Sequence, residues 1–203
     1  MHPQNTKAEL HRLLQVRNEH PEKSTEVDAQ IHTIFAETHA ILVLDMSGFS
    51  RLTIRHGIVH FLAMIHRLSA IATPLVEQRR GTVVKQEADN LFAIFPTVDA
   101  AVSAAADVLK SLAAVNSGLP DIMDLYASIG IGYGEVLLVA AEDLYGNEMN
   151  LASKLGEDLA RSNEILLTEA AFQQLQATTW QCEAIELSVS GLEITAYQVQ
   201  FVR

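Results

Sequence analysis

The order in which strand-like and helix-like segments alternate is the feature that most constrains this fold. A short apolar run at 40–45 predicts a buried strand, and a long helix ending before Gly81 follows, with apolar residues at helical spacing. A hairpin over 82–95 and an alanine-rich helix at 98–114 come next, before strands within 125–140. The order β-α-β-β-α-β predicts an α+β, ferredoxin-like (split βαβ) sheet.

The second half of the chain predicts additions to this unit. We expect separate strands at 125–131 and 135–140, joined through the turn 132–134, Gly-Tyr-Gly. A helix from about 147 to 160, a strand at 164–167, a short helix and two late strands complete the chain. The predicted sheet carries its helices on one face and leaves the other face open to a ligand or a partner.

Two short helices precede the sheet. Leu10, Leu13 and Leu14 indicate the first, Pro21 interrupts the pattern, and a second narrow apolar stripe follows. We therefore divide the chain into an N-terminal helical extension, 1–37, and a main domain, 38–203.

Charge and composition exclude several classes of partner. There are 14 lysines and arginines against 25 aspartates and glutamates, a net charge of −11. This balance argues against nucleic acid or an anionic membrane as the partner. The start of the chain is polar, no apolar run approaches the roughly 20 residues that span a bilayer, and one cysteine permits no intrachain disulfide. We expect a cytoplasmic protein.

Two aspartates are candidate metal ligands. Asp45 ends the first strand, and Asp89 lies in the hairpin turn that the fold places beside it. Paired carboxylates suit Mg²⁺ or Mn²⁺, although both residues are also ordinary turn formers. Gly48 and Phe49 lead to Ser50, a plausible N-cap, where free backbone N–H groups favour phosphate.

Three segments resemble class III adenylate and guanylate cyclases. The run 43–50, Val-Leu-Asp-Met-Ser-Gly-Phe-Ser, resembles the first metal-binding motif of that family. The hairpin 81–89 has a lysine four residues before its aspartate, as the family does, and 143–154 resembles the Asp…Gly…Asn…Ala-Ser-Arg signature. The similarity covers roughly 40–175 and implies the nucleotide cyclase fold.

The resemblance implies a two-metal site. Asp45 and Asp89 would bind two Mg²⁺ or Mn²⁺ ions, with the Met46 carbonyl assisting. The ribose 3′-hydroxyl of a nucleoside triphosphate would then attack the α-phosphate, giving a 3′,5′-cyclic monophosphate and pyrophosphate.

The resemblance also assigns the substrate contacts. Lys85 and Asp143 would read the purine and favour ATP, hence cAMP as product, because guanine reverses the donor and acceptor pattern. Asn150 would orient the ribose, and Lys154 would stabilise charge on the transferred phosphoryl group. Family sites form between two subunits, which implies a homodimer.

Several positions depart from the family pattern. Lys154 replaces the usual arginine, so a point charge replaces a bidentate fork, and Ala88 replaces a glycine before the metal aspartate. The segment 137–143 has no arginine, and 190–192 lacks a common phosphate-binding lysine. The alternative is therefore a catalytically degenerate domain that dimerises and binds nucleotide. A diguanylate cyclase ranks lower, because the hairpin lacks that group's Gly-Gly-Asp/Glu-Glu-Phe turn.

Overall fold

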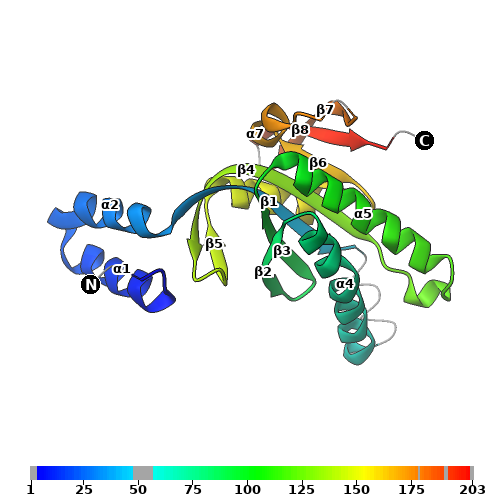
Figure 1. Ribbon diagram of the computed structural model, residues 1–203, viewed down its shortest axis with the longest axis horizontal. Helices are drawn as coiled ribbons and strands as arrows, with labels where there is room; N and C mark the ends of the chain where they lie inside the picture. Colours follow the sequence, from blue (N-terminus) through cyan, green and yellow to red (C-terminus); the bar gives the residue numbers. More distant parts are fainter. Residues whose placement is uncertain (1–3, 48–56, 178, 190–191, 202–203) are drawn as a thin grey trace.

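The computed structural model describes residues 4–47, 57–177, 179–189 and 192–201 (Figure 1). Within this part of the chain, one eight-stranded sheet forms the centre of the molecule. Its strands are β1 (Ala36–Met46), β2 (Thr82–Glu87), β3 (Asn90–Phe95), β4 (Ala127–Val139), β5 (Asp143–Tyr145), β6 (Ile165–Thr168), β7 (Gln181–Val189) and β8 (Leu192–Gln200). The principal helices are α1 (Lys7–Glu19), α2 (Ser24–Phe35), α4 (Ile58–Gln78), α5 (Val98–Asn116), α6 (Asn147–Ser153), η3 (Lys154–Leu159, a π-helix) and α7 (Glu169–Gln174).

The strand order confirms the predicted α+β fold. The strands run β2-β3-β1-β4-β6-β8-β7, and β5 pairs with β4. The first four are the sheet of the split βαβ unit, with β1 antiparallel to both β3 and β4. The strands β6 to β8 are the expected C-terminal additions, and β6 joins β4 in parallel.

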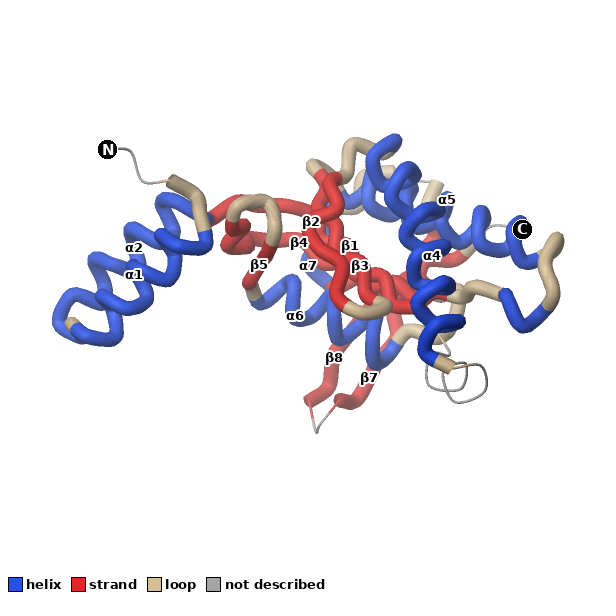
Figure 2. The backbone as a smooth tube through the Cα atoms, turned by 90° about the horizontal axis from the view of Figure 1, so that it is seen from below, coloured by secondary structure: helices blue, strands red, loops and turns tan. Residues whose placement is uncertain are grey.

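Helices cover both faces of the sheet, to different extents. On one face, α4 and α5 pack over alternate residues of β1, among them Leu42 and Leu44. On the other face, Ile41 and Val43 share a smaller core with Ala152 of α6. Figure 2 shows α4 and α5 on one side of the strands and α6 on the other. The face that we expected to be open is therefore partly covered by α6 and η3.

The predicted turn at 132–134 is wrong, because β4 is one continuous strand that pairs with β1 from Ala127 to Leu137. The glycines serve close packing. A Cβ at Gly132 would lie 2.7 Å from the Glu148 carbonyl oxygen, and one at Gly134 would lie 2.8 Å from the Glu148 Cγ. Glycine within a strand marks close approach of another backbone as well as a turn, and here α6 is that neighbour.

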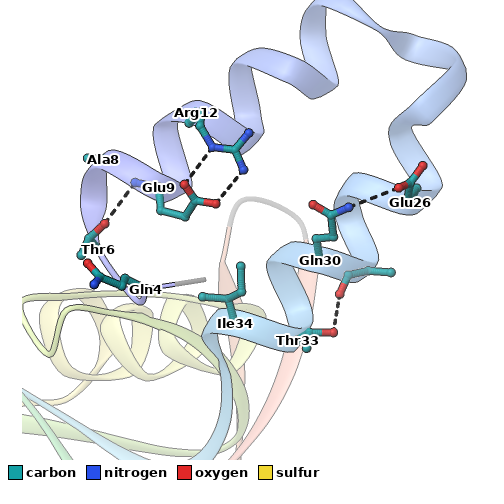
Figure 3. Close-up of a pocket in the computed structure, with 10 residues that line it drawn as sticks. Gln4, Thr6, Ala8, Glu9, Arg12, Glu26, Gln30, Thr33 and Ile34 are labelled. Carbon is teal, nitrogen blue, oxygen red and sulfur yellow. Dashed lines mark hydrogen bonds and ion pairs between the residues drawn. The ribbon is translucent and has the colours of Figure 1, made fainter. Parts of the chain in front are cut away.

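The N-terminal helices form as predicted and lie at one end of the sheet (Figure 1). Their inward side chains, including Leu13 and Phe35, pack with Val139 of β4. A hollow of about 890 Å³ between the helices is lined by paired polar groups such as Glu9 and Arg12 (Figure 3). Because β1 begins at Ala36, α2 leads into the sheet without a linker.

The described helix α4 is long and apolar enough, by length and composition alone, to cross a membrane. This corrects the expectation that no apolar stretch reaches that length. Its inner residues Met64, Leu68 and Ala72 belong to the main core. A core helix meets the same criterion, so the finding is weak support for a membrane span.

Replacing Gly130 tests the contact between the sheet and η3. A Cβ there would lie 2.0 Å from the Ala152 carbonyl oxygen and 2.6 Å from the Gly156 nitrogen, both backbone atoms that cannot rotate away. We expect Gly130→Ala to lower the free energy of unfolding by about 2–3 kcal/mol, as overpacking does. Urea unfolding measures this. Gly118→Ala is the control, because its nearest neighbour would lie 3.8 Å away, and equal stability of the two variants would contradict the contact.

Candidate active site

One row of residues crosses four strands at the end of β1. The register sets Asp45 opposite Asn90 of β3 and Ser128 of β4, and Asn90 opposite Glu87 of β2. Directly opposed residues in antiparallel strands point to the same face, here the face of α6. Asp89 lies in the turn next to Asn90, so the hairpin brings it beside Asp45.

The two predicted metal ligands interact electrostatically. Burial, followed by repulsion from Asp89, Glu157 and Asp158, raises the pKa of Asp45 to about 7. The pKa of Glu157 is also raised, by burial and by the charges of Asp158 and Asp89, while a hydrogen bond with Ser153 opposes the shift. Carboxylates from β1, the hairpin turn and η3 therefore lie near enough to interact electrostatically.

A divalent cation fits this arrangement. Like charges that oppose one another's ionisation are neutralised by a cation, and oxygen donors are the ligands that Mg²⁺ and Mn²⁺ prefer. The Asn90 side-chain oxygen is buried beside Asp45 and has no hydrogen-bond partner among the described residues. Within the same part of the chain, no cluster of three or more histidine, cysteine or acidic side chains has metal-binding geometry, so any ion there needs further ligands.

The two predicted base-reading residues meet across the sheet. The Lys85 ammonium on β2 lies 2.9 Å from Asp143 Oδ1 on β5, and these side chains are only 16% and 18% exposed. Lys85 also lies 3.2 Å from Glu87 and 4.9 Å from the centre of the Phe92 ring. Lys85 and Asp143 are about 60 residues apart in the chain.

Mutual pairing keeps Lys85 and Asp143 charged. Burial opposes the charge on Lys85, but its hydrogen bonds to Asp143 and Glu87 outweigh burial and raise its pKa. Burial likewise opposes ionisation of Asp143, and hydrogen bonds from Lys85 and Tyr145 outweigh it and lower that pKa. The site thus offers a fixed cationic donor next to a fixed anionic acceptor.

The predicted catalytic residues lie four positions apart on consecutive helices. Asn150 is exposed on α6, and Lys154 begins η3. The Lys154 ammonium pairs with Asp158 at 2.8 Å, and Asp158 is one of the charges that raise the pKa of Asp45. The lysine therefore belongs to the same charged region as the carboxylates.

The remaining predicted positions lie in and after β1 and in the hairpin turn. Gly48, Phe49 and Ser50 lie outside the described residues. The Met46 side chain is buried in the main core, and its carbonyl role stays a prediction. Ala88 has φ 51°, the left-handed conformation that glycine adopts more readily, so the turn forms despite its Cβ.

Sequence reasoning missed three residues near these groups. Asn90 could have been found from the hairpin register, since it falls opposite Asp45. Tyr145 follows Asp143 by two residues, which places both side chains on one side of β5, and its hydroxyl donates to Asp143. Glu157 gave no signal, because its position depends on the π-helical turn of η3.

The chain matches the family described as adenylate and guanylate cyclase catalytic domain over residues 34–200. It is 28% identical over 140 residues to a putative adenylate cyclase 3 of Rhizobium meliloti, covering 69% of this chain and 24% of that protein. It is 25% identical over 163 residues to the serine/threonine-protein kinase pkn2 of Myxococcus xanthus, covering 79% and 19%. The chain thus spans about a quarter or less of the length of these relatives.

Solved structures share the fold. An adenylate/guanylate cyclase/hydrolase from Silicibacter pomeroyi has a TM-score of 0.68 at 24% identity, covering 81% of this chain and 96% of that one. The adenylyl cyclase CyaB from P. aeruginosa has 0.68 at 21%, covering 83% and 97%. The guanylyl cyclase Cya2 has 0.70 at 18%, covering 81% and 92%.

The family match spans most of the chain, and both the strand order and the meeting of the motif residues agree with it. The chain belongs to the class III adenylate and guanylate cyclase catalytic-domain family.

Proposed function

We propose that this chain converts a nucleoside triphosphate, ATP rather than GTP, to the 3′,5′-cyclic monophosphate (cAMP) and pyrophosphate. The observation that carries the proposal is the convergence of Asp45 and Asp89, whose carboxylates repel one another in the absence of a cation. The two aspartates are distant in sequence, and a folded chain that holds them together at this energetic disadvantage has a site prepared for cations.

The pair Lys85 and Asp143 supports ATP as the substrate. A lysine donates to adenine N1, and an aspartate accepts from the 6-amino group, whereas guanine carries an acceptor at position 6 and a donor at N1. One of the similar solved structures is a rhodopsin-guanylyl cyclase with converted specificity in complex with ATPalphaS. Cyclases of both specificities share this fold, so the argument for ATP rests on the two side chains.

Two Mg²⁺ or Mn²⁺ ions would be held by Asp45 and Asp89, with the Met46 carbonyl as a further oxygen donor. When bound, they supply Lewis-acid polarisation of the phosphates and a lower pKa for the attacking hydroxyl. The protein's own groups then orient the reactants: Lys85 and Asp143 hold the base, Asn150 holds the ribose, and Lys154 faces the charge that develops on the transferred phosphoryl group.

A homodimer in the cytoplasm is part of the proposal. The resemblance implies that metal ligands from one copy and base-reading and transition-state residues from the other complete each site. Asn150 is exposed on α6, where a substrate held by a second copy can reach it.

Removing either metal ligand tests the catalytic role. We expect Asp45→Ala and Asp89→Ala each to lower cyclic nucleotide formation about a hundredfold or more, because a bound metal contributes several kcal/mol to the transition state. Each of the four ribonucleoside triphosphates is incubated with Mn²⁺ and the products are identified by mass spectrometry. Asp107→Ala is the matched control, since Asp107 lies on α5, away from the site, and pairs with Arg79 at the end of α4. Full metal-dependent turnover by the Asp45 variant would refute the assignment.

The raised pKa of Asp45 predicts a pH-dependent stability in the metal-free protein. In the folded state the pKa of Asp45 is about 7, whereas the ordinary value is 3.8. The contribution of the protonated carboxyl to stability is therefore complete below about pH 4 and is lost as the pH rises through 7. With EDTA present, we expect Asp45→Asn to stabilise the protein at pH 8 more than at pH 5.

Thermal unfolding at both pH values measures that difference, and Mg²⁺ provides a second readout. At pH 8 we expect Mg²⁺ to raise the melting temperature of the wild type and not that of Asp45→Asn, because a ligand stabilises the state that binds it. An equal effect of Mg²⁺ on both proteins would place the ion elsewhere.

A second candidate function is a nucleotide-binding dimerisation module without turnover. The pairing of Lys154 with Asp158 favours it, because the Lys154 ammonium, which is assigned to the transition state, is already paired with a carboxylate. We expect Asp158→Asn to release Lys154 and to raise kcat severalfold if the chain is an enzyme. Tight binding of an ATP analogue, with no cyclic product from either protein after long incubation with Mn²⁺, would establish the second function.

A further inference from the structure

We propose that Tyr145 is a positioning residue that determines purine specificity: its hydroxyl orients the Asp143 carboxylate so that a single acceptor site faces the base. The inference rests on the proposed function, because it concerns how Asp143 reads the substrate. Tyr145 is not among the residues that the cyclase resemblance assigns to the site.

The contacts of Asp143 leave little freedom. Its Oδ1 accepts from the Lys85 ammonium at 2.9 Å and from the Leu144 backbone N–H at 3.0 Å. Its Oδ2 accepts from the Tyr145 hydroxyl at 2.7 Å. A carboxylate has about four acceptor sites, so about one remains, and it lies on Oδ2.

Lys85 likewise has one N–H donor left for a ligand. Its ammonium has three N–H donors, and Asp143 and Glu87 take two of them. The pair therefore presents about one donor and one acceptor side by side. That order suits the N1 and 6-amino groups of adenine and opposes the N1–H and 6-oxo groups of guanine.

Tyr145 lies next to β4 and to the N-terminal helices. It lies opposite Leu137 in the β4–β5 pair, and it lines a hollow of about 440 Å³ together with Leu14 and Ile31 of the N-terminal helices. The hydrogen bond to Asp143 raises the pKa of Tyr145, so the phenol stays a donor at neutral pH. The residue is 47% exposed, so the loss of its hydroxyl spares the core.

Without that hydroxyl, Oδ2 has no protein partner among the described residues, and the hydrogen bonds from Lys85 and Leu144 hold the carboxylate through Oδ1, so Oδ2 can swing about that oxygen. A carboxylate free to turn can meet the N1–H of guanine as well as the amino group of adenine. Tyr145→Phe should therefore weaken the preference for ATP while leaving the chemical step alone, since neither the metal ligands nor Lys154 changes.

The experiment compares wild type, Tyr145→Phe and Tyr126→Phe. Tyr126 is a matched control, because its hydroxyl donates at 2.9 Å to Asp124, also two residues earlier, and the residue is 40% exposed. We expect Tyr145→Phe to raise KM for ATP and to lower the ATP/GTP ratio of kcat/KM, each by about tenfold, the effect of one hydrogen bond to a charged group. Its kcat should stay within about twofold of wild type, and Tyr126→Phe should match wild type throughout. Melting temperatures confirm that each variant is folded.

Binding of non-hydrolysable ATP and GTP analogues separates this inference from the proposed function. If wild type forms no cyclic product but Tyr145→Phe loses the preference in binding, the proposed reaction fails and the positioning role stands. If turnover is normal and Tyr145→Phe keeps the wild-type ATP/GTP ratio and KM, the positioning role is overturned. A fall in kcat alone would also overturn it, and an absence of any nucleotide binding by wild type would overturn both.

Discussion

The pairing of β1 with β3 on one side and β4 on the other is the constraint on which the rest of the site depends. It fixes Asp45 opposite Asn90, which puts the hairpin turn and Asp89 beside it. A shift of one residue would turn Asp45 to the opposite face, into the core under α4 and α5. The apolar middle of β1, which pairs with β4, opposes that shift, because Leu42 and Leu44 would then leave the core.

The second constraint is the direct contact of backbones between the sheet and the helices on its other face. Gly130 and Gly156 meet without side chains between them, and Gly132 accommodates Glu148. This close approach brings η3 near enough for Glu157 and Asp158 to raise the pKa of Asp45. The same helices carry Asn150 and Lys154, so the packing that stabilises the fold also positions the proposed ribose and phosphate contacts.

Much of this could be predicted from the sequence because the relevant signals are local. Each element could be predicted from its own residues: the apolar run before Asp45, the apolar residues at helical spacing after Gly57, and the hairpin around Asp89. The order of these elements indicated the fold class. The error at 132–134 arose where one residue type has two uses, since glycine permits a turn and also permits close packing. No local pattern tells these uses apart, because the deciding neighbour, Glu148, lies more than ten residues away.

The sequence alone determined the order of elements, the family resemblance and the identity of the motif residues, since these depend on residue types and short-range spacing. Only the tertiary structure decided that Lys85 meets Asp143, that burial and neighbouring carboxylates raise the pKa of Asp45, and that the Tyr145 hydroxyl donates to Asp143. Those properties depend on distance and burial between segments far apart in the chain, and electrostatic energies change steeply with both.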